Sequence, residues 1–501
     1  MHGGAKIVVF QSAFLASHSM AEIAVIAVLA LIAAAAIGWV SFRLPKSVLL
    51  GIVLAAAMLQ GFKPVGYVSI SLLLPIAMAP AIVASSKKAH WDLWAKLGLG
   101  ILVWQVISAI WAVKLGSVAH AALSTAVLVV CYLLARQVAA DPGGLAKALR
   151  IASPFVVLEA LLTVLFRMAP AVEAAYYGSP VAMFFSEPNV ELMLTGIPQN
   201  VSDPGKAGGL LLSGNVASLL LVLVSCVYAY AYIRLRKTLF AVVSLIALVG
   251  CIATGSKTAL ALLVLLPALA IVSLFLIRKS KVAYLFLGLL LAGFGGLIVF
   301  LGVTGSQMFT TSVTTLGDRG RLWALAGQGF LEHPVLGLGY GGWSEYLKAH
   351  ADAVFEPDRW FQDFPPHNLV IQAWADAGIP LAILVSAIAL LPICISVRLL
   401  WRLRADRVFS SATLRTAVLS IGSVWIIVHA MADTTGFFGE NHTLPFLSLI
   451  VALLAYEAGT LTHDRAGDDD TANLDSESKS VMTQEGAVST SSAPASRKSR
   501  I

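Results

Sequence analysis

Long apolar stretches separated by short polar connections dominate the pattern of this chain. Most run for about 20 residues, the length that an α-helix needs to cross a bilayer. Because the runs are continuous rather than alternating, they predict helices and not the strands of a membrane barrel. The candidate spans are 22–40, 47–61, 65–84, 97–113, 118–139, 151–168, 208–233, 238–254, 258–277, 282–303, 368–397, 414–432 and 443–461. A short second span and a weak apolar segment at 7–17 set the prediction at 12–14 transmembrane helices in an all-α integral membrane protein.

Composition agrees with this pattern and excludes several other classes. The 501 residues are 58% hydrophobic and only 12% charged. The net charge of +7 does not indicate nucleic-acid binding, because no soluble basic domain carries it. All four cysteines lie in or beside apolar runs without metal-type spacing, so we interpret them as packing residues.

The distribution of cations predicts the topology. Of the 34 Lys and Arg residues, 19 lie in the connections after the odd-numbered spans and nine in those after the even-numbered spans. Such an excess marks the cytoplasmic loops of membrane proteins, so the even-numbered connections are predicted to face outward.

Two outward connections are long and rich in Gly, Pro and aromatic residues, which favours ordered irregular structure. The tail is rich in Asp, Ser and Thr and is predicted to be disordered and cytoplasmic; its three consecutive aspartates are interpreted as solvated rather than metal-binding. The predicted segments are an N-terminal segment (1–21), N-terminal helices (22–168), a first outward loop (169–207), central helices (208–303), a second outward loop (304–367), C-terminal helices (368–461) and the tail (462–501).

The second outward loop carries the candidate chemistry. It ends in PPHN at residues 365–368, immediately before an apolar run. His367 or Asn368 is expected in the N-cap region of the following helix, where the helix dipole attracts anions. Arg319 and Arg321 are expected to lead an amphipathic helix, and a Gly-rich turn follows at 333–343. The alternative is a simple helix cap with an interfacial histidine. The shared location of cations, turn and histidine favours a site for an anion.

These stretches together resemble the O-antigen ligase and O-antigen polymerase superfamily. The resemblance is carried by GRLW (320–323), HPVLGLGYGGW (333–343), PHNLVIQAWADAGI (366–379), SGNVASLLLV (213–222) and ATGSKTALALL (253–263). Lys257 stands where many members have Arg, which keeps the cation but loses a bidentate fork for phosphate. Pro380 occupies a place where a second Gly is common.

The resemblance implies transfer of a glycan from an undecaprenyl-diphosphate carrier to an acceptor hydroxyl, without metal or cofactor. Arg321 and Lys257 would neutralise the leaving diphosphate. His367 would accept or share the proton of the acceptor, since its unperturbed pKa lies near 6.5. A single displacement of this kind would invert the anomeric carbon. Asn368 would support the site as the cap beside His367.

Further residues are candidates for substrate binding, each with a structural alternative. Arg319 competes with Arg321 for the phosphate, and Asn215 supports the site or bonds a neighbouring helix. His333 contacts substrate or orders the loop. Tyr340 and Trp343 stack on sugar rings or anchor the loop at the membrane interface.

The resemblance places the protein in the bacterial inner membrane with its active site facing the periplasm. Polymerisation of an exopolysaccharide or O-antigen is favoured over ligation of the glycan to lipid A core. Expected partners are the lipid-linked donor, the glycan or lipid A core acceptor, membrane lipids, and chain-length regulator and export proteins. A transporter is the rival class, but Glu159 and His429 are too few ionisable groups within spans to outline a pathway.

Overall fold

The computed structural model describes residues 20–59, 61–63, 68–182, 205–278, 285, 288–289, 307–354, 364–405, 409–432 and 441–460. Met1–Leu454 form one compact unit, and Ala455–Ile501 form a second, of which residues 455–460 are described. The segment 7–17, most of the predicted span 282–303 and the tail 462–501 lie outside the described residues.

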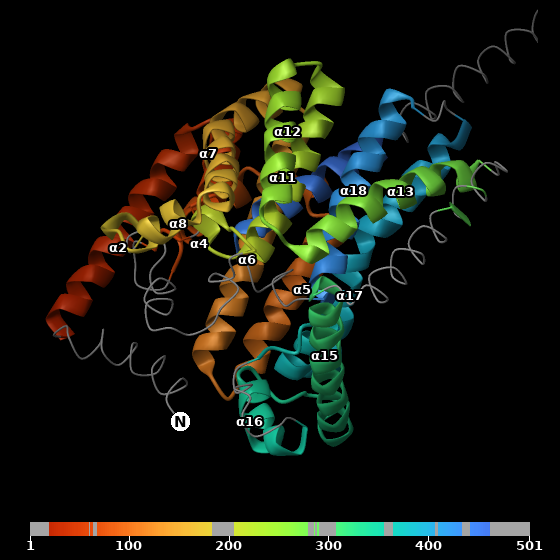
Figure 1. The fold of residues 1–501 in the computed structure, drawn as a ribbon. Helices are drawn as coiled ribbons and strands as arrows, with labels where there is room; N and C mark the ends of the chain where they lie inside the picture. Colours follow the sequence, from red (N-terminus) through yellow and green to blue (C-terminus); the bar gives the residue numbers. More distant parts are fainter. Residues whose placement is uncertain are drawn as a thin grey trace, which may run out of the picture. The chain divides into compact units, whose positions relative to one another are not determined.

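The described chain is built almost entirely from helices (Figure 1). In chain order these are α2 (Met20–Arg43), α3 (Lys46–Ala57), α4 (Ile70–Ala84), α5 (Leu93–Ser108), α6 (Leu115–Ala139), α7 (Pro142–Met168), α8 (Pro170–Tyr177), α11 (Gly214–Leu235), α12 (Thr238–Ala253), α13 (Lys257–Ile277), α15 (Gln307–Glu332), α16 (Gly342–Val354), α17 (Leu369–Arg402) and α18 (Ser411–Ala432), with a last apolar helix within Asn441–Thr460. Short 3₁₀ turns are η1 (Lys88–His90), η2 (Gly209–Leu211), η3 (Leu403–Ala405) and η4 (Asn441–Thr443).

The prediction of an all-helical membrane protein is confirmed. Among the described residues, seven helices are long and apolar enough to cross a membrane, and five shorter apolar helices accompany them. They correspond to all the predicted spans except 282–303. Large apolar side chains such as Leu31, Val264 and Ile383 remain exposed, as a lipid-facing surface requires.

Helix α11 lies at the centre of the first unit. It is apolar on nearly all sides, and a helix of that kind is expected to be surrounded by others. It packs against α7, α12 and α18, and its Leu219, Leu220 and Leu221 are fully buried. A serine pair also links it to α12: the hydroxyl oxygens of Ser225 on α11 and Ser244 on α12 are 3.0 Å apart.

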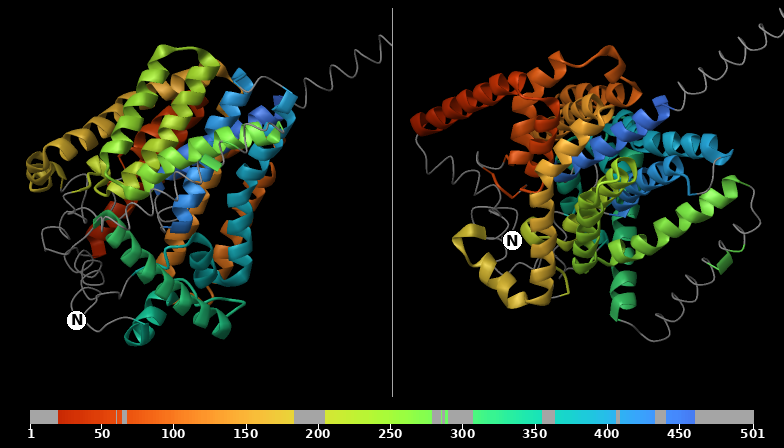
Figure 2. Two further views of the ribbon diagram at one scale, coloured as in Figure 1. Left: turned by 45° about the vertical axis from the view of Figure 1, so that its right-hand side comes forward. Right: turned by 90° about the horizontal axis from the view of Figure 1, so that it is seen from above.

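The second long loop contains two helices, and the sequence predicted them only in part. The expected amphipathic helix exists, but α15 begins at Gln307, so Arg319 and Arg321 lie within it and do not lead it. A second helix, α16, was not foreseen, because the predicted loop was interpreted as irregular. Figure 2 shows α15 and α16 beside each other, and both contact the beginning of α17. Packing between these three segments supplies the stabilisation that short loop helices lack by themselves.

Glu159 has a structural partner within the fold. Its fully buried carboxylate accepts a hydrogen bond from the backbone N–H of Leu210 at 2.9 Å, and so fixes η2 just before α11. The neighbouring Gly209 lies so close that an added Cβ would come within 2.6 Å of the carboxylate. This intramembrane acid therefore holds a turn against α7.

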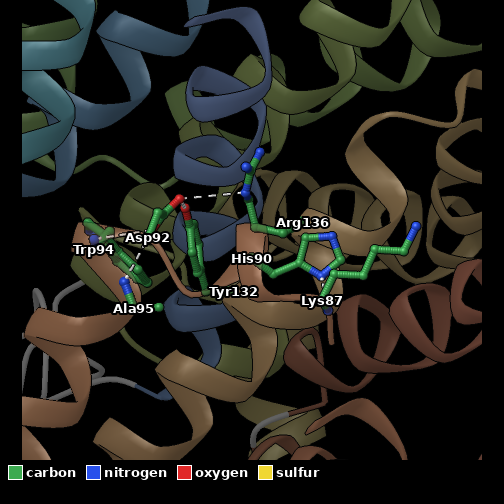
Figure 3. A network of polar contacts seen from close by, with 7 residues as sticks. All are labelled: Lys87, His90, Asp92, Trp94, Ala95, Tyr132 and Arg136. Carbon is green, nitrogen blue, oxygen red and sulfur yellow. Dashed lines mark hydrogen bonds and ion pairs between the residues drawn. The ribbon is translucent and has the colours of Figure 1, made fainter. Parts of the chain in front are cut away.

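A polar network fastens the beginning of α5 to α6 (Figure 3). Asp92 caps α5 by accepting hydrogen bonds from the backbone N–H groups of Trp94 and Ala95. The Tyr132 hydroxyl donates to the same carboxylate, and Arg136 lies 3.6 Å from it. One acid thus joins the cap of one helix to a hydroxyl and a guanidinium of the next.

We expect Asp92→Ala to lower the thermal stability of the purified protein by more than Asp92→Asn. The asparagine retains a capping oxygen, whereas alanine removes the cap, worth about 1 kcal/mol, together with the partners of Tyr132 and Arg136. Thermal unfolding in detergent measures the difference. Equal melting temperatures for the two variants would show that the helix cap adds nothing to the thermal stability and that only the carboxylate's charge matters.

Candidate active site

The segment before α17 has an unusual backbone. Of the two residues expected in the N-cap region, Asn368 is the cap, since its side-chain oxygen accepts hydrogen bonds from Val370 N at 3.0 Å and Ile371 N at 3.1 Å. The preceding residue, His367, has a φ of +49°. A side chain in this left-handed region stores about 1–3 kcal/mol of strain and persists only where the surroundings enforce it. The half-buried His367 is therefore held in place by its environment.

Two tryptophans bind the backbone of this segment. Trp323 of α15 donates its indole N–H to the carbonyl oxygen of Pro366 at 2.8 Å, and Trp343 of α16 donates to that of Phe364 at 2.8 Å. Residues distant in sequence thereby fix the chain directly before His367. The first of these bonds joins the GRLW stretch, which contains Arg321, to the PHN stretch.

The Gly-rich turn packs on a kink in α17. The helix is interrupted at Ala377 and Gly378, where Gly378 has φ +79° and ψ −171°. Leu338 N donates to Ala375 O at 2.8 Å, and Ile379 N donates to Val335 O at 3.1 Å, so the turn satisfies backbone groups that the kink releases. A Cβ on Gly378 would lie 1.8 Å from the Val335 oxygen, so this contact requires glycine.

The other side of the turn lies against the connection between α5 and α6. The Trp111 indole donates to Leu336 O at 3.0 Å, and Lys114 N donates to Tyr340 O at 2.9 Å. From within α5, the Trp104 indole donates to Ala377 O at 2.9 Å, at the kink itself. The α5–α6 hairpin and α17 therefore enclose the turn between them.

Tyr340 and Trp343 are buried by this packing. Both side chains are about one-twentieth exposed, and Trp343 belongs to an apolar cluster with Leu322, Leu325, Ala326, Leu347, Trp374 and Ala375. Tyr340 hydrogen-bonds the side chain of Gln105, and burial raises the pKa of its hydroxyl. Stacking on sugar rings would need exposed ring faces. The two roles considered for this pair, sugar stacking and anchoring of the loop at the membrane interface, stay predictions.

The remaining residues of the second long loop take different positions. Arg321 is exposed on α15, whereas Arg319 is half-buried, as expected for two residues that point to different helix faces. His333 has an exposed side chain, and its backbone carbonyl instead accepts from Gly337 N at 3.1 Å and from the Trp374 indole at 3.3 Å. If His333 orders the loop, it does so through its backbone carbonyl and not through its side chain.

Lys257 and Asn215 begin two neighbouring helices. Gly214 stands so close to the Thr254 carbonyl that an added Cβ would lie 2.6 Å from its oxygen, and Ser256 caps α13 just before Lys257. Asn215 and Lys257, both half-buried, therefore lie near each other at the beginnings of α11 and α13. Their convergence with Arg321 and His367 stays a prediction.

Several residues that hold the site were not identified from the sequence. Trp104 and Trp111 are aromatic residues near the end of a span. Such residues are common at membrane interfaces, so nothing in the sequence indicated a role in the site. Trp323 lies inside the GRLW stretch, but its hydrogen bond to Pro366 joins positions 43 residues apart and has no local signature. Gln105 gave no signal that distinguished it from ordinary helix residues. Gly378 lies in the stretch that carries the resemblance, but that stretch gave no sign of a kink there.

Part of the chain is similar to a known protein family. Residues 242–386 match a family model described as O-antigen ligase. The match includes α13, the two loop helices, the Gly-rich turn and the beginning of α17. No curated protein matches the chain.

The match confirms the resemblance to the O-antigen ligase and polymerase superfamily. Together with the apolar helices, it indicates a multi-pass membrane protein of the kind found in bacteria, similar to a family that carries out glycan transfer of the ligase or polymerase type. Such proteins act as membrane glycosyltransferases on lipid-linked glycan donors and glycan acceptors.

We expect Gly378→Ala to destabilise the protein strongly and to abolish activity. The new methyl group would collide with Val335 O, and the positive φ would add strain, so the turn must separate from the kink. Gly317→Ala is the matched control, because a Cβ there meets no atom within 4 Å. Thermal unfolding and surface glycan on gels measure both effects, and a Gly378→Ala protein as stable as the control would contradict the proposed tight contact.

We expect Trp323→Phe to reduce activity more than stability. Phenylalanine keeps an aromatic ring but cannot donate to Pro366 O, which leaves the segment before His367 less firmly held. The net loss in stability should be about 1 kcal/mol, as is typical of one hydrogen bond. Glycan transfer rates and melting temperatures of the purified variants test this, and unchanged transfer would show that the bond does not position His367.

Proposed function

We propose that the protein transfers a glycan from undecaprenyl diphosphate to an acceptor hydroxyl at the periplasmic side of the membrane. The observation that supports this most directly is the hydrogen bond from Trp323 to Pro366 O, because it joins the stretch bearing Arg321 to the stretch bearing His367. The outward orientation rests on the distribution of Lys and Arg among the connections.

In the proposed reaction the donor diphosphate is neutralised by cationic side chains. Arg321 is exposed on α15 and can approach a lipid-linked diphosphate from the surface. Lys257, at the first position of α13, would supply a second positive charge if the helix beginnings converge as predicted. Two cations of this kind stabilise the charge that develops on a leaving phosphate without a metal ion.

His367 would then handle the proton of the acceptor. The acceptor oxygen forms a bond to the anomeric carbon while the bond between that carbon and the diphosphate oxygen breaks, and the electron pair leaves with the diphosphate. The hydroxyl proton passes to the imidazole of His367. The strained backbone at His367 supports this role, because strain of this type is concentrated where a side chain must be aimed.

Polymerisation of an exopolysaccharide or O-antigen is our preferred form of this reaction. The donor is of the same kind for a polymerase and a ligase, so the acceptor must distinguish them. Ligation to lipid A core is the second candidate, and the family match is compatible with either reaction.

We expect His367→Gly to remove activity while the protein stays at least as stable as the wild type. Glycine adopts a positive φ without strain, so loss of the imidazole is separated from damage to the backbone. Removal of a general base typically lowers the rate by about 10²–10⁴-fold. His350→Ala is the matched control, since that histidine lies on α16 and stacks on Tyr346.

The experiment resolves surface polysaccharide and lipid-linked intermediates on gels, with protein level measured alongside. Accumulation of single lipid-linked repeats indicates a polymerase, and long lipid-linked chains without their final attachment indicate a ligase. Unchanged glycans with the His367→Gly protein present at normal level would refute the catalytic role of His367 and favour the rival class, a membrane transporter.

A further inference from the structure

Helix α15 has a second apolar side next to the one that packs on the fold. Leu322, Leu325 and Ala326 are buried in the cluster with Trp343 and Trp374. Because an α-helix has 3.6 residues per turn, positions 316, 320, 323, 327, 330 and 331 share another side of the same helix. We call these six positions the apolar stripe. They consist of Leu316, Gly320, Trp323, Gly327, Phe330 and Leu331.

The large side chains of the apolar stripe are exposed. Leu331 is 81% and Leu316 62% exposed, while Phe330 and Trp323 are 40% and 37% exposed. Phe330 lies at the border of the stripe, with its ring centroid 5.5 Å from that of Trp374. A contiguous apolar surface of this kind on one helix indicates a binding surface rather than isolated exposed residues.

The two glycines make notches in the apolar stripe. A Cβ on Gly320 or Gly327 would meet no atom within 4 Å, so neither is required by packing within the described fold. Gly329, on the packed face, is different, because a Cβ there would lie 3.3 Å from Trp374. Glycine inside a helix costs about 1 kcal/mol relative to alanine. Two such residues on an exposed apolar face indicate that something approaches the helix backbone closely there.

The apolar stripe is continuous with the candidate active site. Trp323, at its centre, donates to the carbonyl that precedes His367. Arg319 lies one turn before Trp323 on the neighbouring side of the helix, and Arg321 lies on the same helix. An apolar surface bordered by cations matches a molecule that has a long hydrocarbon chain and an anionic head.

We propose that the apolar stripe of α15 binds the isoprenoid chain of the lipid-linked donor. This proposal rests on the proposed function and adds the surface that holds the lipid part of the substrate. Branched methyl groups of the chain fill the notches at Gly320 and Gly327, and the diphosphate at the end of the chain lies towards the arginines. A helix without glycines would contact a bilayer surface equally well. The notches therefore favour a single isoprenoid chain over bulk lipid as the molecule that binds here.

The test fills the notches in the purified full-length protein. The double variant Gly320→Leu/Gly327→Leu is compared with Gly317→Leu, which changes an equally open glycine that lies off the apolar stripe. Each of these changes replaces glycine by a better helix former, so a difference in binding between the variants cannot be attributed to a loss of helix stability. The probes are undecaprenyl diphosphate and inorganic diphosphate, and the measurements are the Kd of each together with the oligomeric state.

We expect the double variant to bind undecaprenyl diphosphate at least about tenfold more weakly, since leucine side chains would displace several apolar contacts. Its Kd for inorganic diphosphate should be unchanged, and Gly317→Leu should match the wild type for both probes. Wild-type affinity in the double variant, equal losses in Gly317→Leu, or a change confined to the oligomeric state would each overturn the proposal.

Arg321→Ala separates this proposal from the function on which it rests. If Arg321→Ala loses glycan transfer and diphosphate binding while the double variant is unaffected, the function stands and the lipid surface is refuted. If Arg321→Ala keeps full transfer and full diphosphate binding, the proposed donor site itself is refuted, and the apolar stripe with it.

Discussion

The close backbone contact between the Gly-rich turn and the kink in α17 is the constraint on which the candidate site depends. At Gly378 the chain passes so near Val335 that a single methyl group could not be placed between them. The kink interrupts the helical hydrogen bonds of α17, and the backbone of residues 335–338 replaces them. A buried, unsatisfied backbone group costs as much as a lost hydrogen bond, so turn and helix are stable only together.

This contact also orients the parts of the loop that bear the candidate chemistry. With the turn fixed on α17, α15 and α16 pack over its first turns, and their tryptophans reach the carbonyls of the segment before Asn368. The same turn is held from the other side by Trp111 and Lys114. The loop is therefore an extension of the transmembrane scaffold, which suits a reaction that must position a lipid-borne substrate.

His367 illustrates how such a scaffold bears strain. Its left-handed backbone is unfavourable for a side chain with a Cβ, and an isolated helix cap would have no reason to adopt it. Hydrogen bonds on both sides of the residue leave the chain little freedom to relax: the Pro366 carbonyl accepts from the Trp323 indole, and the Asn368 side chain accepts from the backbone of α17. The surrounding fold thus decides where the imidazole lies.

The sequence by itself determined the helical membrane architecture, a helix cap at His367 or Asn368 and the stretches that resemble the O-antigen ligase family. These features depend on local pattern, because bilayer thickness sets span length and capping involves residues two or three positions apart. The same local reasoning misjudged the start of α15 and overlooked α16, since those helices are stabilised by packing on α17. Only the tertiary structure decided the kink at Gly378, the burial of Tyr340 and Trp343, and the strain at His367. Each of these depends on contacts between segments far apart in sequence, and a local pattern carries no record of which distant backbone will approach.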